Sequence, residues 1–157
     1  MKEFQDFVKR LSSPDRKKMI LIYCKNPNKV VGETLLLDEL VLFESLSILE
    51  RKGEQFIVSS GKKDRRTHKM GSCYPNSSKM MKKGYDYVEG YVVNKKSGVI
   101  NCHSWNVDKD GNHFDFTYDN PNEYDYFGVV IPESVVWNVG HKNGGIWYCV
   151  LPFVEDF

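Results

Sequence analysis

The sequence has no C-x-x-C pair, no apolar run near the length of a membrane span, and no internal repeat or low-complexity segment. Its four cysteines, Cys24, Cys73, Cys102 and Cys149, are widely spaced, which argues against a disulfide framework and against a zinc ribbon. A membrane-spanning helix needs about 20 apolar residues, so we expect no membrane segment. Residues 1–10 lack the apolar core of a signal peptide, and the expected location is therefore the cytoplasm.

The chain also has almost no net charge, because 22 basic residues face 21 acidic ones. A bulk attraction to nucleic acid or to membranes therefore has no support, and we expect no specific nucleic-acid partner. Aromatic residues, in contrast, are abundant at 13% and concentrate after residue 73, which suits a β-rich second half. A length of 157 residues predicts one domain, 1–157, that buries its core without covalent staples.

The first 60 residues have the pattern of helices. Phe4, Phe7, Val8 and Leu11 follow the i, i+3, i+4, i+7 spacing of one apolar helix face. Ser13-Pro14-Asp15 is a typical helix start, and a long, leucine-rich segment follows. The predicted helices cover 4–11, 13–24 and 33–52, and a strand is predicted over 55–60.

The rest of the chain has the pattern of strands around one short helix. A polar loop at 61–70 precedes a helix predicted to begin at Pro75 and to end before Gly84. Strands are predicted over 85–93, 99–107, 112–118, 124–131 and 146–152, with a short helix at 132–138. The expected fold class is α+β: a mainly helical N-terminal half (1–60) packed on the antiparallel sheet of a catalytic-type, β-rich part (61–157).

A cysteine, a histidine and an acid occur in the order needed for a nucleophile, its base and the group that orients the base. They are Cys73, His103 and Asp115, 30 and 12 residues apart. Cys73 directly precedes the predicted helix, where backbone N–H groups favour a thiolate. Pro75 disfavours helical geometry at Tyr74, so the helix is expected to leave Cys73 just outside its first turn. The alternatives are a buried structural thiol and a structural histidine.

Strand geometry decides which neighbours can cooperate. Side chains alternate between faces, so Asn101, His103 and Trp105 share one face and Cys102 lies on the other. The Asp110-Gly111 pair predicts a tight hairpin turn, which brings Asp115 opposite the segment from Asn106 to His103. A carboxylate there can fix the imidazole tautomer. Two weaker candidates for this role are Asp119, past the strand, and Asn112, close to the turn.

These motifs resemble the transglutaminase-like branch of the papain-like cysteine enzymes. The resemblance lies in Glu89-Gly90-Tyr91, His103-Ser104-Trp105 and Asp115-Phe116-Thr117, which look like the family's Gly-Tyr, His-Ala-Trp and Asp-Pro-Thr strands. The resemblance covers residues 71–128. The motifs are also similar to those of small uncharacterised phage-encoded proteins, and such a protein would be located in the host cytoplasm. Departures from the pattern are Ser104, Phe116 and the proline after the cysteine.

The resemblance implies a papain-like core, with the nucleophile at a helix N-terminus packed on a sheet that carries the base and the acid. It also implies acyl transfer through a thioester on Cys73, such as peptidase, amidase, deamidase or transamidation chemistry, on a protein or peptide-like amide substrate without a cofactor. The Cys73 backbone N–H is the first candidate for the oxyanion hole, and Asn76 and Trp105 are candidate side-chain donors. The basic loop before the nucleophile supplies candidate substrate-binding residues, Lys62, Arg65, Arg66 and His68.

Two other functional classes remain open. Histidines and cysteines could gather into a metal site, but no pair has the spacing of a zinc motif, so none is predicted. A non-catalytic binding or inhibitor protein could use the same fold to engage a partner protein, since a fold does not fix a function. The basic loop and the surface aromatics would then form its interaction surface.

Overall fold

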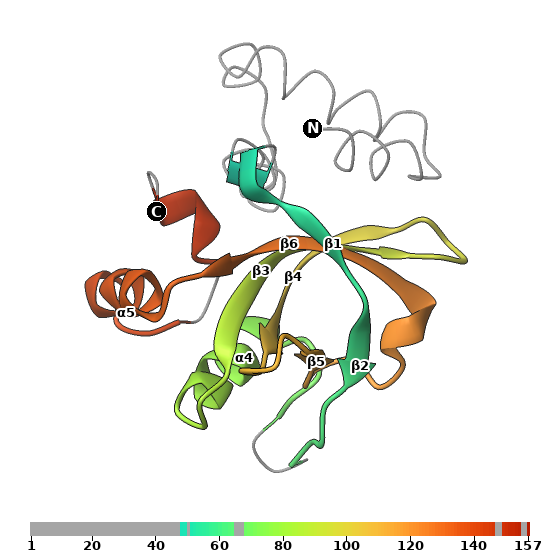
Figure 1. The fold of residues 1–157 in the computed structure, drawn as a ribbon, viewed down its shortest axis with the longest axis horizontal. Coiled ribbons are helices and arrows are strands. Elements are labelled where there is room, and N and C mark those ends of the chain that lie inside the picture. Colours follow the sequence, from blue (N-terminus) through green and yellow to red (C-terminus); the bar gives the residue numbers. More distant parts are fainter. Residues whose placement is uncertain (1–47, 50, 65–67, 147–148, 155–156) are drawn as a thin grey trace.

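The computed structural model describes residues 48–49, 51–64, 68–146, 149–154 and 157 of the chain. In these ranges six strands, two α-helices and two short 3-10 helices follow one another (Figure 1). The elements are β1 (Glu54–Phe56), β2 (Val58–Ser60), α4 (Cys73–Met81), β3 (Asp86–Asn94), β4 (Ile100–Val107), β5 (His113–Asp115), η2 (Pro121–Glu123), β6 (Tyr124–Ile131), α5 (Glu133–Lys142) and η3 (Leu151–Phe153).

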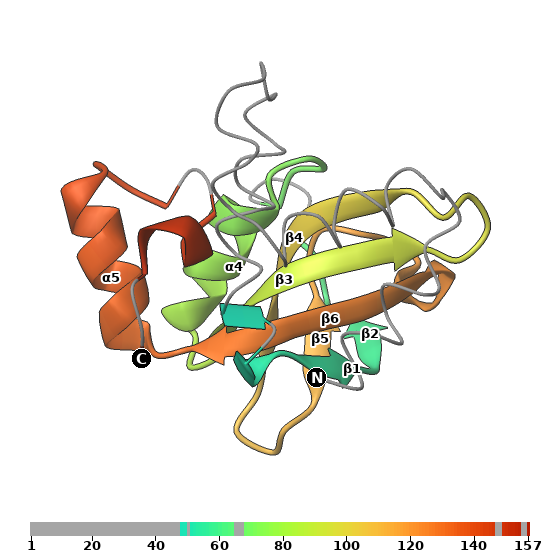
Figure 2. The same cartoon turned by 90° about the horizontal axis from the view of Figure 1, so that it is seen from above.

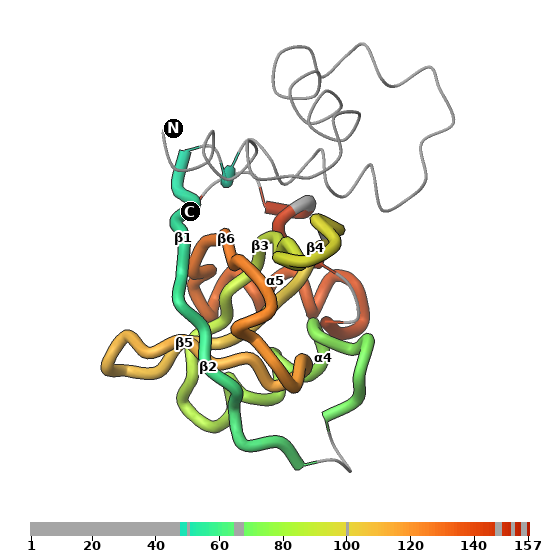
Figure 3. The backbone as a smooth tube through the Cα atoms, turned by 90° about the vertical axis from the view of Figure 1, so that its right-hand side faces the viewer, coloured from blue at the N-terminus to red at the C-terminus, as the bar shows by residue number. Residues whose placement is uncertain are grey.

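The six strands form one sheet in the order β1-β6-β3-β4-β5-β2, antiparallel except for the β2–β5 pair. Its two edge strands, β1 and β2, are separated in the chain by Ile57 alone. One residue spans at most about 3.6 Å, so the opposite edges of the sheet must approach each other. The sheet is therefore curled, and β1 and β2 run across the opening as one continuous arm (Figures 1 and 3).

The two faces of the curled sheet carry different clusters, as side-chain alternation requires. Val88, Val92, Trp105 and Tyr126 meet the arm residue Val58 on the concave face. The convex face carries the larger cluster, which includes side chains of both helices; among its buried members are Tyr87, Tyr91, Phe127, Ile131, Met81, Val136 and Val139. Figure 2 shows α4 and α5 gathered on the same side of the sheet.

Two glycines allow the central strands to curl this tightly. Gly90 of β3 pairs with Gly128 of β6 and, on its other side, with His103 of β4. A Cβ at Gly90 would lie 2.1 Å from the carbonyl oxygen of Phe127, and one at Gly128 would lie 2.5 Å from the indole of Trp105. The glycines thus leave room on the concave face for the rings of the candidate site.

The predicted fold class is wrong in its main feature. The described chain is mostly sheet, and the helices that cover the sheet are α4 and α5 of the second half rather than a helical N-terminal half. The predicted helices at 4–11 and 13–24, and most of the one at 33–52, lie outside the described residues. The described end of the last, 48–49 and 51–52, is helical, and Ile48 and Leu49 join the convex cluster. From residue 54 onward the first part of the chain instead supplies β1 and β2, which complete the sheet at both edges.

Two further boundaries differ from the prediction. α4 begins at Cys73 rather than Pro75, because a proline in the first turn lacks only an N–H that would have no helical acceptor anyway. The strand predicted over 146–152 is not seen at its described residues, 146 and 149–152, and Leu151–Phe153 is a 3-10 helix instead. The backbone N–H groups of Val150 and Leu151 donate to the Glu89 carboxylate, so they are not available to a β-ladder.

Candidate active site

Asp115, the last residue of β5, is a completely buried carboxylate that accepts four hydrogen bonds. Its Oδ1 accepts the backbone N–H groups of Thr117 at 2.6 Å and Tyr118 at 2.9 Å, because the chain turns directly after the strand. Its Oδ2 accepts the Tyr126 hydroxyl at 2.6 Å and lies 2.7 Å from Nε2 of His103. Burial acts to raise the pKa of Asp115, but His103, Tyr126 and the backbone donors lower it below its ordinary value.

His103 lies in the middle of β4, on the concave face, and is 1% exposed. Its Nε2 faces Asp115, and the Cys73 thiol lies near enough to raise the pKa of the same imidazole. With Nε2 engaged, Nδ1 is the nitrogen left for the thiol. Burial acts to lower the pKa of His103, but the Asp115 carboxylate and then Cys73 raise it to about 9. The surroundings therefore favour the imidazolium, the form that a thiolate partner requires.

Cys73 occupies the first turn of α4 and is 9% exposed. The first turn contains no acidic residue, and Ser72 makes no side-chain cap to the helix. The positive end of the helix dipole and the first backbone N–H groups are therefore not neutralised by a local acid. This environment stabilises negative charge, whether on the sulfur or on an oxygen that forms beside it.

α4 packs against β4 beside the short strand β5. β5 pairs with β4 only at Asn106 and Val107. Two polar side chains of β4 fasten the helix there: the Ser104 hydroxyl donates to the Ser77 hydroxyl at 3.1 Å, and Asn106 Nδ2 donates to the Ser77 carbonyl at 3.0 Å. Ser104, which departs from the resemblance, thus serves to position the nucleophile helix.

The two proposed oxyanion side chains are committed to other contacts. Asn76 is fully buried, and its Nδ2 donates to the Lys69 carbonyl at 2.8 Å and to the Thr117 hydroxyl at 3.0 Å. Trp105 is also fully buried, and its indole N–H donates to Nδ1 of His113 at 2.9 Å. Neither side chain has a donor left for an oxyanion. The backbone N–H of Cys73 remains the candidate donor.

The predicted substrate-binding residues are placed differently from one another. Lys62 is exposed, whereas His68 is 8% exposed and its ring stacks on Phe116 at 5.7 Å between centroids. Burial lowers the pKa of His68, so His68 has the surroundings of a packed, neutral ring. Arg65 and Arg66 lie outside the described residues. The weaker acid candidate Asp119 is exposed and ion-paired with Lys63 at 2.7 Å.

Two tyrosines of this site, Tyr118 and Tyr126, were not predicted from the sequence to contact His103 or Asp115. Tyr126 donates to Asp115 from β6, and the Tyr118 ring lies flat on His103 with 4.4 Å between centroids. Strand alternation could have placed Tyr126 on the concave face with His103. Nothing in the spacing pointed to Tyr118, because the turn that starts at Asp115 brings its ring back over the imidazole.

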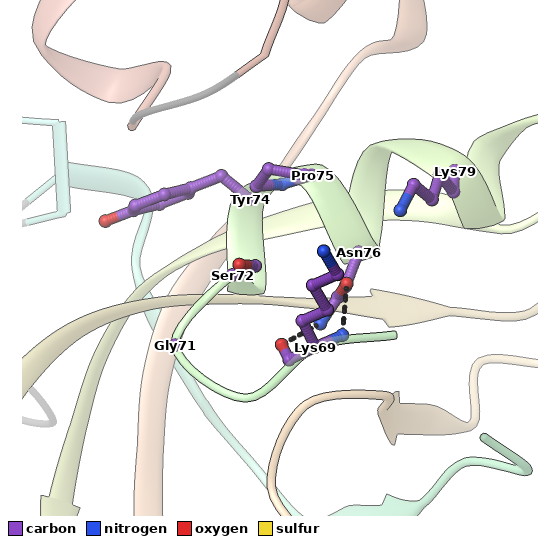
Figure 4. A pocket seen from close by; sticks show the side chains of 7 residues that line it. All are labelled: Lys69, Gly71, Ser72, Tyr74, Pro75, Asn76 and Lys79. Atoms are coloured by element: carbon purple, nitrogen blue, oxygen red, sulfur yellow. Dashed lines mark hydrogen bonds between the residues drawn. The ribbon is translucent and has the colours of Figure 1, made fainter. Parts of the chain in front are cut away.

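A pocket of about 540 Å³ lies at the start of α4. Its lining includes Ser72 and Tyr74, the residues on either side of Cys73 (Figure 4). The rest of the lining comes from the start and one side of α4 and from the loop before it: Lys69, Gly71, Pro75, Asn76 and Lys79. We call this the Lys69–Lys79 pocket. It provides an approach to the start of α4 from the solvent side.

No cluster of three or more potential metal ligands occurs in the described part of the chain, and no described helix could cross a membrane. The three cysteines in the described ranges, Cys73, Cys102 and Cys149, are free thiols. The chain matches no protein-family model, no curated protein and no solved structure.

Proposed function

We propose that this protein is a cysteine-dependent acyl-transfer enzyme, most simply an amide hydrolase, with Cys73, His103 and Asp115 as its catalytic triad. One observation supports this above all. His103 lies 2.7 Å from Asp115 through Nε2, and both the Asp115 carboxylate and the Cys73 thiol raise its pKa. This is the arrangement in which an imidazole takes a proton from a thiol while a carboxylate fixes its tautomer.

The proposed reaction proceeds in two half-reactions. His103 takes the Cys73 proton, and the thiolate attacks the carbonyl carbon of the substrate amide. The oxyanion accepts a hydrogen bond from the Cys73 backbone N–H. The C–N bond then breaks as His103 gives its proton to the leaving amine, and a thioester remains on Cys73. His103 next takes a proton from water, the hydroxide adds to the thioester, and the C–S bond breaks as His103 returns that proton to the sulfur. The free acid leaves and the thiol is restored.

Alkylation by iodoacetamide at pH 7, followed by mass mapping of the modified cysteines, tests the proposal without a known substrate. Cys73 should react at least tenfold faster than Cys102 and Cys149. Burial raises the pKa of Cys149, so that thiol is an internal control for an unactivated group. His103→Ala should remove the advantage of Cys73. Equal rates at the three thiols in the wild type would refute a Cys73 nucleophile.

A binding protein is the second candidate, and the burial of the triad favours it. His103 and Asp115 are at most 1% exposed, and Cys73 is 9% exposed, so the hydrogen bonds could serve only to fasten α4 to the sheet. A partner captured equally by the wild type and by Cys73→Ala, with unchanged mass, would favour this function. A partner cleaved or deamidated by the wild type alone would exclude it.

A further inference from the structure

The Lys69–Lys79 pocket has a one-sided charge. Of the seven described residues that line it, two are lysines and none is acidic. Figure 4 shows the Lys69 side chain rising from the loop before α4 and the Lys79 side chain extending from the helix, with both ammonium groups on the side of the helix where Asn76 lies. Together with the positive end of α4, these groups give the pocket a positive potential.

The loop that carries Lys69 is fixed rather than loosely attached. Asn76 Oδ1 accepts the Lys69 backbone N–H at 3.2 Å, and Asn76 Nδ2 donates to the Lys69 carbonyl at 2.8 Å. Asn76 is itself fully buried and held by the Thr117 hydroxyl. The reciprocal pair therefore ties the backbone of Lys69 to α4, within one turn of Cys73. Such preorganisation reduces the entropic cost of ligand binding.

The position of the pocket determines what it can do for the reaction. Ser72 and Tyr74, the chain neighbours of Cys73, line the pocket, whereas Cys73 itself does not. The pocket therefore lies beside the turn of α4 that carries the sulfur, within reach of a neighbouring residue of a substrate bound there. Tyr74 and Pro75 give this part of the lining an apolar surface, which suits the methylenes of a side chain, and the lysines suit a carboxylate at its end.

We propose that the Lys69–Lys79 pocket is a specificity subsite for an acidic side chain, aspartate or glutamate, on the residue that carries the attacked carbonyl or on the residue before it. This proposal rests on the proposed function of Cys73. It assigns the substrate class as acidic peptides. The roles it gives to Lys69 and Lys79 are substrate binding rather than catalysis.

Matched electrophiles test the subsite on the full chain. The probes are two pairs of peptide chloromethyl ketones. The first pair is acetyl-Gly-Glu and acetyl-Gly-Gln, and the second pair is acetyl-Glu-Gly and acetyl-Gln-Gly. In each pair the reacting group is the same and only a carboxylate replaces a carboxamide. Second-order alkylation rates at Cys73 are measured at pH 7 in low salt. We expect the glutamate probe of at least one pair to react about 3- to 10-fold faster than its glutamine partner, the range expected for one or two exposed charge contacts.

The variants Lys69→Gln and Lys79→Gln should each reduce the glutamate preference and leave the glutamine rate unchanged. The matched control is Lys82→Gln, which removes the same charge at the C-terminal end of α4 but outside the pocket lining. The preference should also fall in 0.5 M salt, because exposed charges are then screened.

The outcomes separate the two proposals. If no probe labels Cys73 faster than Cys149, the proposed nucleophile fails and the subsite fails with it. If Cys73 is labelled fast but neither pair shows a glutamate preference, the subsite is wrong and the nucleophile stands. A preference that Lys82→Gln reduces as much as Lys69→Gln does would show a general field effect and would also overturn the subsite.

Discussion

Tyr118 lies flat against His103, with 4.4 Å between ring centroids and 4° between ring planes. A third ring continues the stack, since Tyr124 lies 4.6 Å from Tyr118 at 16°. The imidazole is thus covered on one face by two half-buried tyrosines. Such a stack fixes the plane of the imidazole ring whose Nε2 faces Asp115. It also limits the access of water to the His103–Asp115 pair.

Tyr118→Ala should loosen His103 without removing any group of the triad. We expect a loss of about 1–3 kcal/mol in the free energy of unfolding, from lost burial and stacking, and slower alkylation of Cys73. The imidazole N–H should exchange faster with water, which NMR measures directly. Tyr118→Phe is the matched control, because it keeps the stack and removes a hydroxyl for which the described residues show no hydrogen-bond partner. An alanine variant with wild-type exchange would show that the stack does not protect His103.

Asp115→Asn should preserve the fold and reduce turnover by orders of magnitude, because an amide N–H facing Nε2 holds the wrong tautomer. The pKa of His103, about 9 in the wild type, should fall, since the carboxylate that favours the imidazolium is gone. The alkylation of Cys73 should then move to higher pH, and the alkaline limb of turnover to lower pH. Rates of iodoacetamide alkylation against pH in both proteins provide the measurement.

The same pair makes a stability prediction whose sign follows from the two pKa shifts. The raised pKa of His103 stabilises the fold below about pH 6.5, and this contribution is lost as pH rises through about 9. The lowered pKa of Asp115 stabilises the fold above about pH 4, and this contribution is lost as pH falls through the folded-state value. Asp115→Asn should therefore be most destabilised relative to the wild type between about pH 4 and 6.5, and the difference should shrink as the pH rises towards 9. Superimposable alkylation curves and equal stabilities would exclude Asp115 from the proposed triad.

Tyr126 acts on the triad through Asp115 and is a positioning residue. Its hydroxyl shares Oδ2 with Nε2 of His103. Tyr126→Phe should cost about 1.5–3 kcal/mol of folding stability, the range for a hydrogen bond to a charged group. The carboxylate should become more basic, so the pKa of His103 should rise. An NMR pH titration of the imidazole measures this shift, and Tyr118→Phe again serves as the control. A structural role alone would change stability and leave the titration of His103 where it is in the wild type.

The sequence predicted the contact between His103 and Asp115 because that contact depends on local rules. A tight turn at Asp110-Gly111 sets β5 beside β4, and alternation puts His103 and Asp115 on one face. The prediction of Trp105 and Asn76 as side-chain donors to an oxyanion failed, because the hydrogen-bond partners of these side chains cannot be read from sequence spacing. Trp105 donates to His113 across the strand pair, and Asn76 donates to Lys69 and Thr117. Side-chain hydrogen bonds between elements are decided by packing, which a single sequence does not show.

The fold prediction failed at the sheet edges for a related reason. Residues 55–60 were expected to be one strand, yet the segment bends at Ile57, which is 95% exposed, and pairs with β6 on one side and β5 on the other. Periodicity identifies an extended segment but not its partners. At its described residues 149–152 the expected strand of 146–152 does not form, because the buried Glu89 carboxylate accepts the backbone N–H groups of Val150 and Leu151.

Glu89 lies in the middle of β3, 2% exposed, and holds the segment after α5 against the sheet. Its carboxylate accepts the N–H of Val150 at 2.7 Å, the N–H of Leu151 at 3.0 Å and the Tyr87 hydroxyl at 2.9 Å. Burial raises its pKa from 4.5 to about 7, although these hydrogen bonds act to lower it. The protonated form is therefore the more stable one in the folded protein below neutral pH.

This raised pKa predicts that the wild type loses stability as pH rises from 4.5 to 7. The folded state binds the Glu89 proton more tightly than the unfolded state, so the contribution is complete below pH 4.5 and is lost as pH rises through about 7. The expected loss is about 3 kcal/mol. Glu89→Gln keeps an oxygen for the Val150 and Leu151 amides and has no proton to lose, so its stability should not decline over this window. Urea unfolding of both proteins at pH 5 and pH 8 measures the difference.

Glu89→Ala is the contrasting variant, because it leaves two buried backbone donors without an acceptor and should be destabilised at both pH values. Parallel stability curves for wild type and Glu89→Gln would show that Glu89 does not titrate in this range.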